Sequence, residues 1–139
     1  MLIEKLLLVT GSLIILGLGS LHLFYTFFSS MFLPRNPNVE IEMKNTSPRL
    51  TRQTTMWKAW IGFNASHSLG AIFFGMINLT MTLAYFPILQ SSVVLSTLNC
   101  VTLLFYLFLA RTYWFRIPFV GILVASVCFM SAFVLMVVN

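Results

Sequence analysis

The sequence predicts an all-α membrane protein: a four-transmembrane-helix antiparallel bundle with both termini on the non-cytoplasmic side. Of the 139 residues, 59% are hydrophobic and only 8% are charged, and the mean hydropathy of +0.95 lies outside the range of soluble globular domains. Four apolar runs have about the length of roughly 20 residues that a helix needs to cross a bilayer. The basic residues gather at the ends of these runs. We therefore expect one transmembrane domain over residues 1–139.

The helices are expected at about 5–33, 48–86, 92–111 and 117–138, with a cytoplasmic loop at about 34–47. The first run is longer than the apolar part of a signal peptide, and no small-residue cleavage site follows it, so we expect it to remain as a helix. Proline disfavours helical geometry in the residue before it, which places the end of this helix at Leu33, before Pro34.

Two patterns predict the structure of the polar connection. Residues 39–44 alternate strictly between apolar and charged side chains, a period typical of an extended strand lying on a surface. Ser47 and Pro48 have the order of a helix N-cap followed by proline at the first helical position. The second helix is therefore expected to begin here and to run its first turns along the membrane interface.

The basic residues predict the topology. With four spans, the first and third connections share one side of the membrane, and only Lys5 lies on the other side. The basic residues of the shared side are Arg35, Lys44, Arg49, Arg52, Lys58, Arg111 and Arg116. Cytoplasmic connections carry the excess of lysine and arginine, so we place both of these in the cytoplasm. The expected partners are anionic lipid headgroups near Arg49, Arg52, Lys58, Arg111 and Arg116, and not nucleic acid, because no soluble domain presents a basic face.

Each helix is predicted to contribute a polar or soft side chain at a similar depth. These side chains lie ten to twelve residues from the basic end of their helix, which at about 1.5 Å per residue is near the bilayer middle. They are His22, His67, Asn99, Cys100 and Cys128. Thr26 shares a helix stripe with His22, and Asn64 and Ser66 accompany His67. We predict a polar layer in which both histidines point into the bundle and lie within about 10–12 Å of each other.

The polar layer has several interpretations. It can consist of structural hydrogen bonds between helices. His22 and His67 can be the axial ligands of haem b, or can join Cys100 and Cys128 in a tetrahedral zinc or copper site. The histidines can also relay a proton or hold the headgroup of a ligand. No carboxylate lies within the spans, so a Ser-His-Asp triad has no acid, and we expect no enzyme.

Two stretches of the sequence carry a resemblance. Gly19 to His22 reads G-S-L-H, and Met56 to Gly70 reads M-W-K-A-W-I-G-F-N-A-S-H-S-L-G. Together they resemble an uncharacterised family of small four-helix bacterial integral membrane proteins. The resemblance covers nearly the whole chain and implies four spans and a multi-pass location in the bacterial inner membrane. It draws attention to His22, Asn64, His67 and Gly70 but implies no role for them.

The function that the sequence predicts is that of a non-enzymatic accessory or ligand-binding four-helix bundle, acting as a homo-oligomer or within a larger membrane complex. The alternative is a haem- or metal-binding redox protein that uses His22 and His67.

Overall fold

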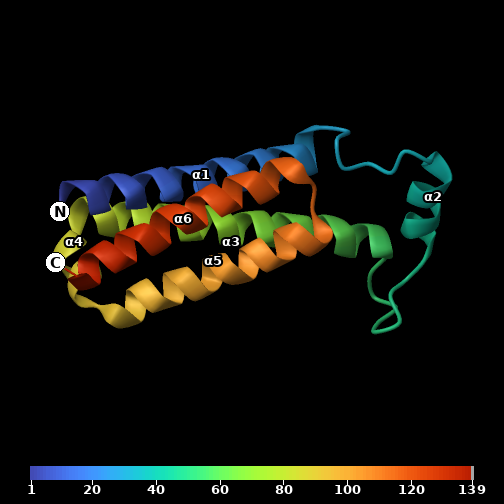
Figure 1. Cartoon of the computed structure of the whole chain (residues 1–139). Helices are drawn as coiled ribbons and strands as arrows, with labels where there is room; N and C mark the ends of the chain where they lie inside the picture. Colours follow the sequence, from blue (N-terminus) through green and yellow to red (C-terminus); the bar gives the residue numbers. More distant parts are fainter. Residues whose placement is uncertain (139) are drawn as a thin grey trace. The chain divides into compact units, whose positions relative to one another are not determined.

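The computed structural model describes residues 1–138, whose regular structure is helical throughout. In chain order the helices are α1 (Leu2–Phe28), α2 (Pro37–Asn45), α3 (Met56–Ala84), α4 (Phe86–Ser91), α5 (Val93–Tyr113) and α6 (Arg116–Val138) (Figure 1). α1, α3, α5 and α6 are each long and apolar enough to cross a membrane. The prediction of an all-α chain with four long apolar helices is confirmed, and it is the pattern of a multi-pass membrane protein.

The outward-facing side chains of these helices are largely apolar. Phe63 and Phe73 on α3 are 74% and 69% exposed, and Val94 on α5 is 68% exposed. In the most apolar 18-residue stretch of α5, only 17% is buried inside the chain. A monomeric soluble protein rarely exposes contiguous apolar surface on this scale, whereas such a surface is stable against lipid.

The contacts of the chain divide it into two compact units. The first unit contains Met1–Leu18 and the chain from Ala71 onward, and the second unit is Gly19–Gly70. The division falls inside α1 and inside α3. The single transmembrane domain over 1–139 stays a prediction, and Asn139 lies outside the described residues.

The first unit holds the apolar core. Its buried side chains come from α1 and from α3 to α6: Leu8, Ile15, Ala71, Phe86, Leu89, Leu103, Ala110, Ile122, Ala125, Phe129 and Ala132. α5 lies along α6, and only two residues, 114–115, join them (Figure 1). α1 and α3 come close together at Gly75, where an added Cβ would lie 2.8 Å from the Leu16 Cβ and 2.9 Å from the Ser12 carbonyl oxygen. Glycine at this position is what lets the two backbones come so near.

The turn between α3 and α5 differs in detail from the prediction. α3 ends at Ala84, two residues before the expected Phe86, and the short helix α4 follows. Pro87 stands in the first turn of α4, where its missing N–H costs nothing. The Ser92 side chain accepts a hydrogen bond from the Leu95 N–H and caps α5.

In the second unit the predicted strand is wrong, because residues 39–44 lie in helix α2. The Asn36 side chain accepts the Asn38 N–H at 3.0 Å, and Pro37 occupies the first turn, which together start a helix. Lys44 then pairs with Glu40 at 2.6 Å, one turn away. These capping signals outweigh the alternating pattern.

The first long helix is shorter than predicted, because α1 ends at Phe28 and not at Leu33.

The predicted start of the second long helix at Ser47 and Pro48 is also wrong. Residues 46–55 form a loop, and α3 begins only at Met56, so the connection predicted at 34–47 is longer than expected. The Met56 N–H donates to the Thr46 carbonyl oxygen at 2.8 Å and closes the base of this loop. Thr55 Oγ1 accepts the Lys58 N–H at 3.3 Å, so Thr55 and not Ser47 caps the helix.

Candidate functional site

The centre of the candidate site is a hydrogen bond between α1 and α3 within the second unit. His22 Nε2 lies 2.9 Å from Asn64 Oδ1, and Asn64 Nδ2 donates to the Trp60 carbonyl oxygen at 2.8 Å. The second bond commits the amide nitrogen of Asn64, so its oxygen faces His22 as an acceptor. An acceptor requires a donor, and His22 therefore carries its hydrogen on Nε2. In the neutral ring this leaves Nδ1 as a hydrogen-bond acceptor.

His67 and Phe32 flank the His22 ring. The two imidazole centroids are 5.5 Å apart with the ring planes at 73°, and the Phe32 ring centroid lies 4.5 Å from that of His22. Asn64 and His67 stand three residues apart on α3, and such residues lie on the same face of a helix. The prediction that the two histidines lie within reach of each other is confirmed.

Two buried hydroxyls support the backbone around the site. Thr26 Oγ1 donates to the His22 carbonyl oxygen at 2.8 Å, and Ser68 Oγ donates to the Asn64 carbonyl oxygen at 2.7 Å. Each hydroxyl is satisfied within its own helix, four residues back, as is common for buried serine and threonine. Thr26 was expected in the polar layer, and it lies beside His22 as a backbone support.

Ser66 does not join the site. Its side chain is exposed, and its hydroxyl donates to the Phe63 carbonyl oxygen at 3.1 Å. Ser66 is only one residue from His67, and neighbours in a helix point in directions about 100° apart. Gly62 and Gly70 are exposed as well.

Asn99 belongs to a second polar cluster, which lies in the first unit. Asn99 Nδ2 donates to Asn78 Oδ1 at 2.6 Å, and Asn78 Nδ2 donates to Asn99 Oδ1 at 3.1 Å. Asn78 lies eleven residues after His67 on α3. The common polar layer for all four helices stays a prediction.

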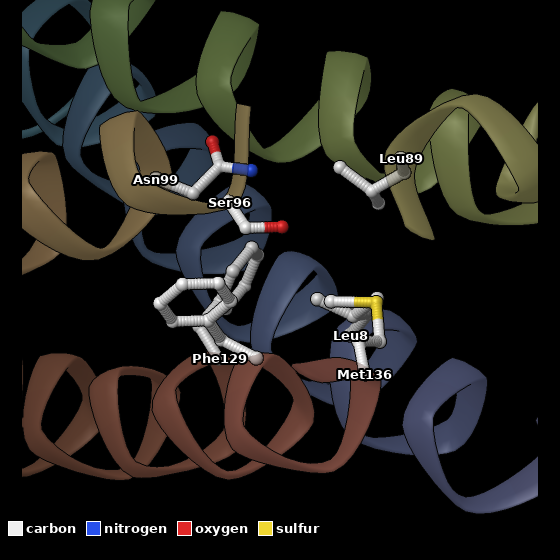
Figure 2. Close-up of a pocket in the computed structure, with 7 residues that line it drawn as sticks. Leu8, Leu89, Ser96, Asn99, Phe129 and Met136 are labelled. Atoms are coloured by element: carbon white, nitrogen blue, oxygen red, sulfur yellow. The ribbon is translucent and has the colours of Figure 1, made fainter. Parts of the chain in front are cut away.

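The recess beside Asn99 is too narrow for a ligand. Leu8, Leu89, Ser96, Asn99, Phe129, Phe133 and Met136 line it (Figure 2). The labelled side chains come from α1, α4, α5 and α6 and surround this recess. The space between them does not admit a water molecule, so these residues form a packing contact.

The sequence predicted a tetrahedral metal site from His22, His67, Cys100 and Cys128. Among residues 1–138, no three His, Cys, Asp or Glu side chains come close enough together to hold a metal ion. His22 and His67 belong to the second unit, and Cys100 and Cys128 belong to the first.

The haem interpretation does not fit the histidine geometry. Axial ligation needs a porphyrin plane between two imidazoles that point their nitrogens at one iron. Here the rings meet edge to face at 5.5 Å, which leaves no room for that plane, and Nε2 of His22 is bonded to Asn64.

Sequence reasoning missed two contributors to the site. Phe32 was placed inside the first helix, but the chain turns after Phe28 and lays the Phe32 ring against His22. Ser29 marks this turn, because its hydroxyl donates to the Tyr25 carbonyl oxygen and accepts the Met31 N–H. The second contributor is Trp60, whose backbone carbonyl oxygen orients Asn64.

Comparison of the chain with family models, with curated proteins and with solved structures finds no match.

Proposed function

We propose that this protein is a non-enzymatic ligand-binding component of the bacterial inner membrane, and that His22 and His67 hold its ligand. The four long helices cross the membrane as an antiparallel bundle with both termini outside and residues 29–55 in the cytoplasm. The chain acts as a homo-oligomer or within a larger membrane complex, and it belongs with the small four-helix bacterial proteins that it resembles in sequence. The concentration of basic residues in the two cytoplasmic connections supports this orientation.

The observation that carries the proposal is the fixed orientation of His22. The chain of bonds from the Trp60 carbonyl through Asn64 to Nε2 leaves Nδ1 of His22 as an acceptor beside His67. A polar ring within an apolar segment is costly unless its nitrogens are satisfied. The ligand class that fits is a small molecule with an O–H or N–H donor and an apolar body, which can enter from the lipid.

The partner of His22 also favours binding over catalysis. In hydrolytic triads a carboxylate holds the histidine and stabilises the imidazolium that forms during the reaction. Asn64 orients the ring in the same way but carries no charge. The glutamates of the second unit, Glu40 and Glu42, lie on α2, and Glu40 is paired with Lys44. Asn64 therefore orients His22 to accept a hydrogen bond at Nδ1 but supplies no negative charge that would stabilise an imidazolium.

The test is to identify what the protein retains during purification. The wild-type protein and the variants His22→Asn and His67→Asn are extracted in mild detergent, and the bound small molecules are analysed by mass spectrometry. We expect a stoichiometric compound in the wild type that both variants lose while their helical circular dichroism is unchanged. Ser66→Ala, on the exposed side of α3, is the control and should retain the compound.

Two outcomes contradict the proposal. A compound held equally by all variants would place the ligand elsewhere, and the absence of any compound from the wild type would leave the histidines a structural role. A visible absorption spectrum and a metal analysis of the same samples distinguish the proposal from the alternative of a haem- or metal-binding redox protein. A Soret band or a stoichiometric metal that the histidine variants lose would replace the proposal with that alternative.

A further inference from the structure

The loop between α2 and α3 is closed and structured. We call residues 46–56 the closed loop, because the hydrogen bond from the Met56 N–H to the Thr46 carbonyl oxygen joins its two ends. Inside it, the Thr51 N–H donates to the Pro48 carbonyl oxygen at 3.2 Å and forms a turn. Thr51 Oγ1 accepts the Gln53 N–H at 3.1 Å. Figure 1 shows the closed loop leaving α2 and returning to the start of α3. Its conformation is therefore set before any partner binds.

The turn places one apolar and two basic side chains at the apex of the closed loop. Arg49 and Leu50 are the two central residues of the Pro48–Thr51 turn, and Arg52 follows it. The Leu50 side chain is 94% exposed, the highest value among the large apolar residues of the described chain. Both arginines are exposed, and neither takes part in the ion pairs of residues 1–138.

The base of the closed loop has the composition of a membrane interface. Trp57 and Trp60 open α3, and the Lys44 ammonium lies 5.3 Å from the centroid of the Trp57 ring. Tryptophan is enriched at the level of the lipid headgroups. Lys58 adds a further exposed cation next to Trp57. Residues 46–58 contain three basic residues and no acidic one, so the surface repels other cations and attracts anions.

We propose that the closed loop is a docking element for anionic phospholipids, in which Arg49 and Arg52 bind the headgroup phosphates and Leu50 enters the acyl-chain boundary. The proposal rests on the membrane-spanning part of the proposed function and is independent of the histidine site. It differs from the interfacial helix that the sequence predicted, because a preformed turn holds the three side chains together. Arginine suits this place, since its aliphatic stem lies along lipid while its guanidinium binds phosphate in two-pronged fashion.

The apolar residue between the cations selects lipid over other polyanions. A nucleic acid or an acidic protein surface would satisfy the arginines but would leave Leu50 in water. A bilayer offers phosphates and hydrocarbon within one side-chain length of each other. Near an anionic surface each arginine should favour the bound position about fivefold, and the pair about thirtyfold.

The experiment measures the depth of position 50 in a bilayer. The full chain carrying Cys100→Ala, Cys128→Ala and Leu50→Cys is labelled with an environment-sensitive fluorophore. It is reconstituted into vesicles of phosphatidylcholine, alone or in equal mixture with phosphatidylglycerol. We expect a blue-shifted emission, protection from aqueous iodide and quenching by shallow spin-labelled lipid, all stronger in the anionic vesicles. High salt should reduce the difference, because it screens the arginines.

Two matched variants complete the design. A label at Asn38→Cys, exposed on α2 of the same unit, should stay accessible to iodide in both vesicles. Adding Arg49→Gln and Arg52→Gln to the Leu50→Cys chain should remove the effect of phosphatidylglycerol. Adding inorganic phosphate while the total ionic strength is held constant should change nothing, because the site takes its phosphate from lipid.

Three results would overturn the proposal. A label at position 50 that iodide reaches in both kinds of vesicle would show that the closed loop stays in water. Equal protection with and without phosphatidylglycerol would deny the role of the arginines. Protection that appears only in native membranes, and not in vesicles, would assign the closed loop to a protein partner. None of these results depends on whether His22 and His67 retain a ligand, so the two proposals can fail separately.

Discussion

Asn64 determines which ring nitrogen of His22 is left to accept a hydrogen bond. The amide nitrogen of Asn64 donates to the Trp60 carbonyl oxygen, so its amide oxygen is the atom that faces Nε2 of His22. The sequence predicted that His22, Asn64 and His67 belong together, since polar side chains inside an apolar helix need partners and helical spacing puts them on shared stripes. It could not predict Phe32, whose contact depends on a turn after Phe28 that nothing in the apolar pattern marks. It also included Ser66, which lies next to His67 in sequence but on an exposed face.

Replacing Asn64 with alanine should release His22. We expect a loss of thermodynamic stability on the order of 1 kcal/mol, the usual size of a hydrogen bond between membrane helices. In ¹⁵N-histidine NMR spectra the Nε2–H form of His22 should no longer dominate. The control is Ser66→Ala, because the Ser66 hydroxyl bonds only to its own helix. Equal losses in the two variants would contradict the role given to Asn64.

At the scale of the elements, helices α1 and α3 meet through Gly75 and α3 and α5 through a pair of amides. The apolar runs and their lengths predicted the four long helices. The sequence did not predict α2 as a helix, because alternation over six residues indicated a strand while Asn36 and Pro37 supplied a helix start. Nor did it predict which polar residues pair, since Asn78 and Asn99 lie at unequal distances from the basic ends of their helices.

Gly75→Ala should destabilise the protein by about 1–3 kcal/mol, because the new methyl group would meet backbone atoms of α1 that cannot move aside. The matched control is Gly62→Ala on the same helix, where no atom lies within 4 Å of the added Cβ. That change should be neutral or should stabilise by up to about 1 kcal/mol through helix propensity. Thermal unfolding in detergent micelles measures both. If the two variants have the same melting temperature, the close approach at Gly75 is not present in the folded protein.

Asn78 and Asn99 should behave as one unit in a double-mutant cycle. Either single alanine variant leaves the other amide without its partner, so the double variant should lose little more than each single one. We expect a coupling free energy of about 1 kcal/mol. The control is a second double-mutant cycle with Asn78→Ala and Ser66→Ala, in which the two losses of stability should be additive. Additive losses for Asn78 and Asn99 would show that their two hydrogen bonds contribute nothing to stability.

Across the whole molecule, the basic residues are unevenly distributed, and the proposed orientation rests on this asymmetry. Of the eight lysine and arginine residues, five lie within 35–58, on the connection between α1 and α3 or in the first turn of α3. The sequence could predict this asymmetry because it needs no tertiary structure. Depth is different, because it depends on where each helix begins and ends, and here α3 starts eight residues after the predicted position.

Cysteine labelling of intact bacterial cells should report the orientation. In a chain with Cys100→Ala and Cys128→Ala, Asn45→Cys should be protected from a membrane-impermeant thiol reagent, and Ser91→Cys at the opposite connection should react. Both side chains are exposed in the folded chain. After permeabilisation both should react, which controls for local burial. Labelling of position 45 but not of position 91 in intact cells would reverse the topology.

The hydrogen bond between Thr46 and Met56 also makes the closed loop a suitable site for inserting additional residues. Because the two ends are fixed to each other by backbone atoms alone, the residues between them can be lengthened without moving α2 or α3. An epitope tag or a small fluorescent domain inserted after Leu50 would thus report on the protein in living cells while the four long helices keep their places.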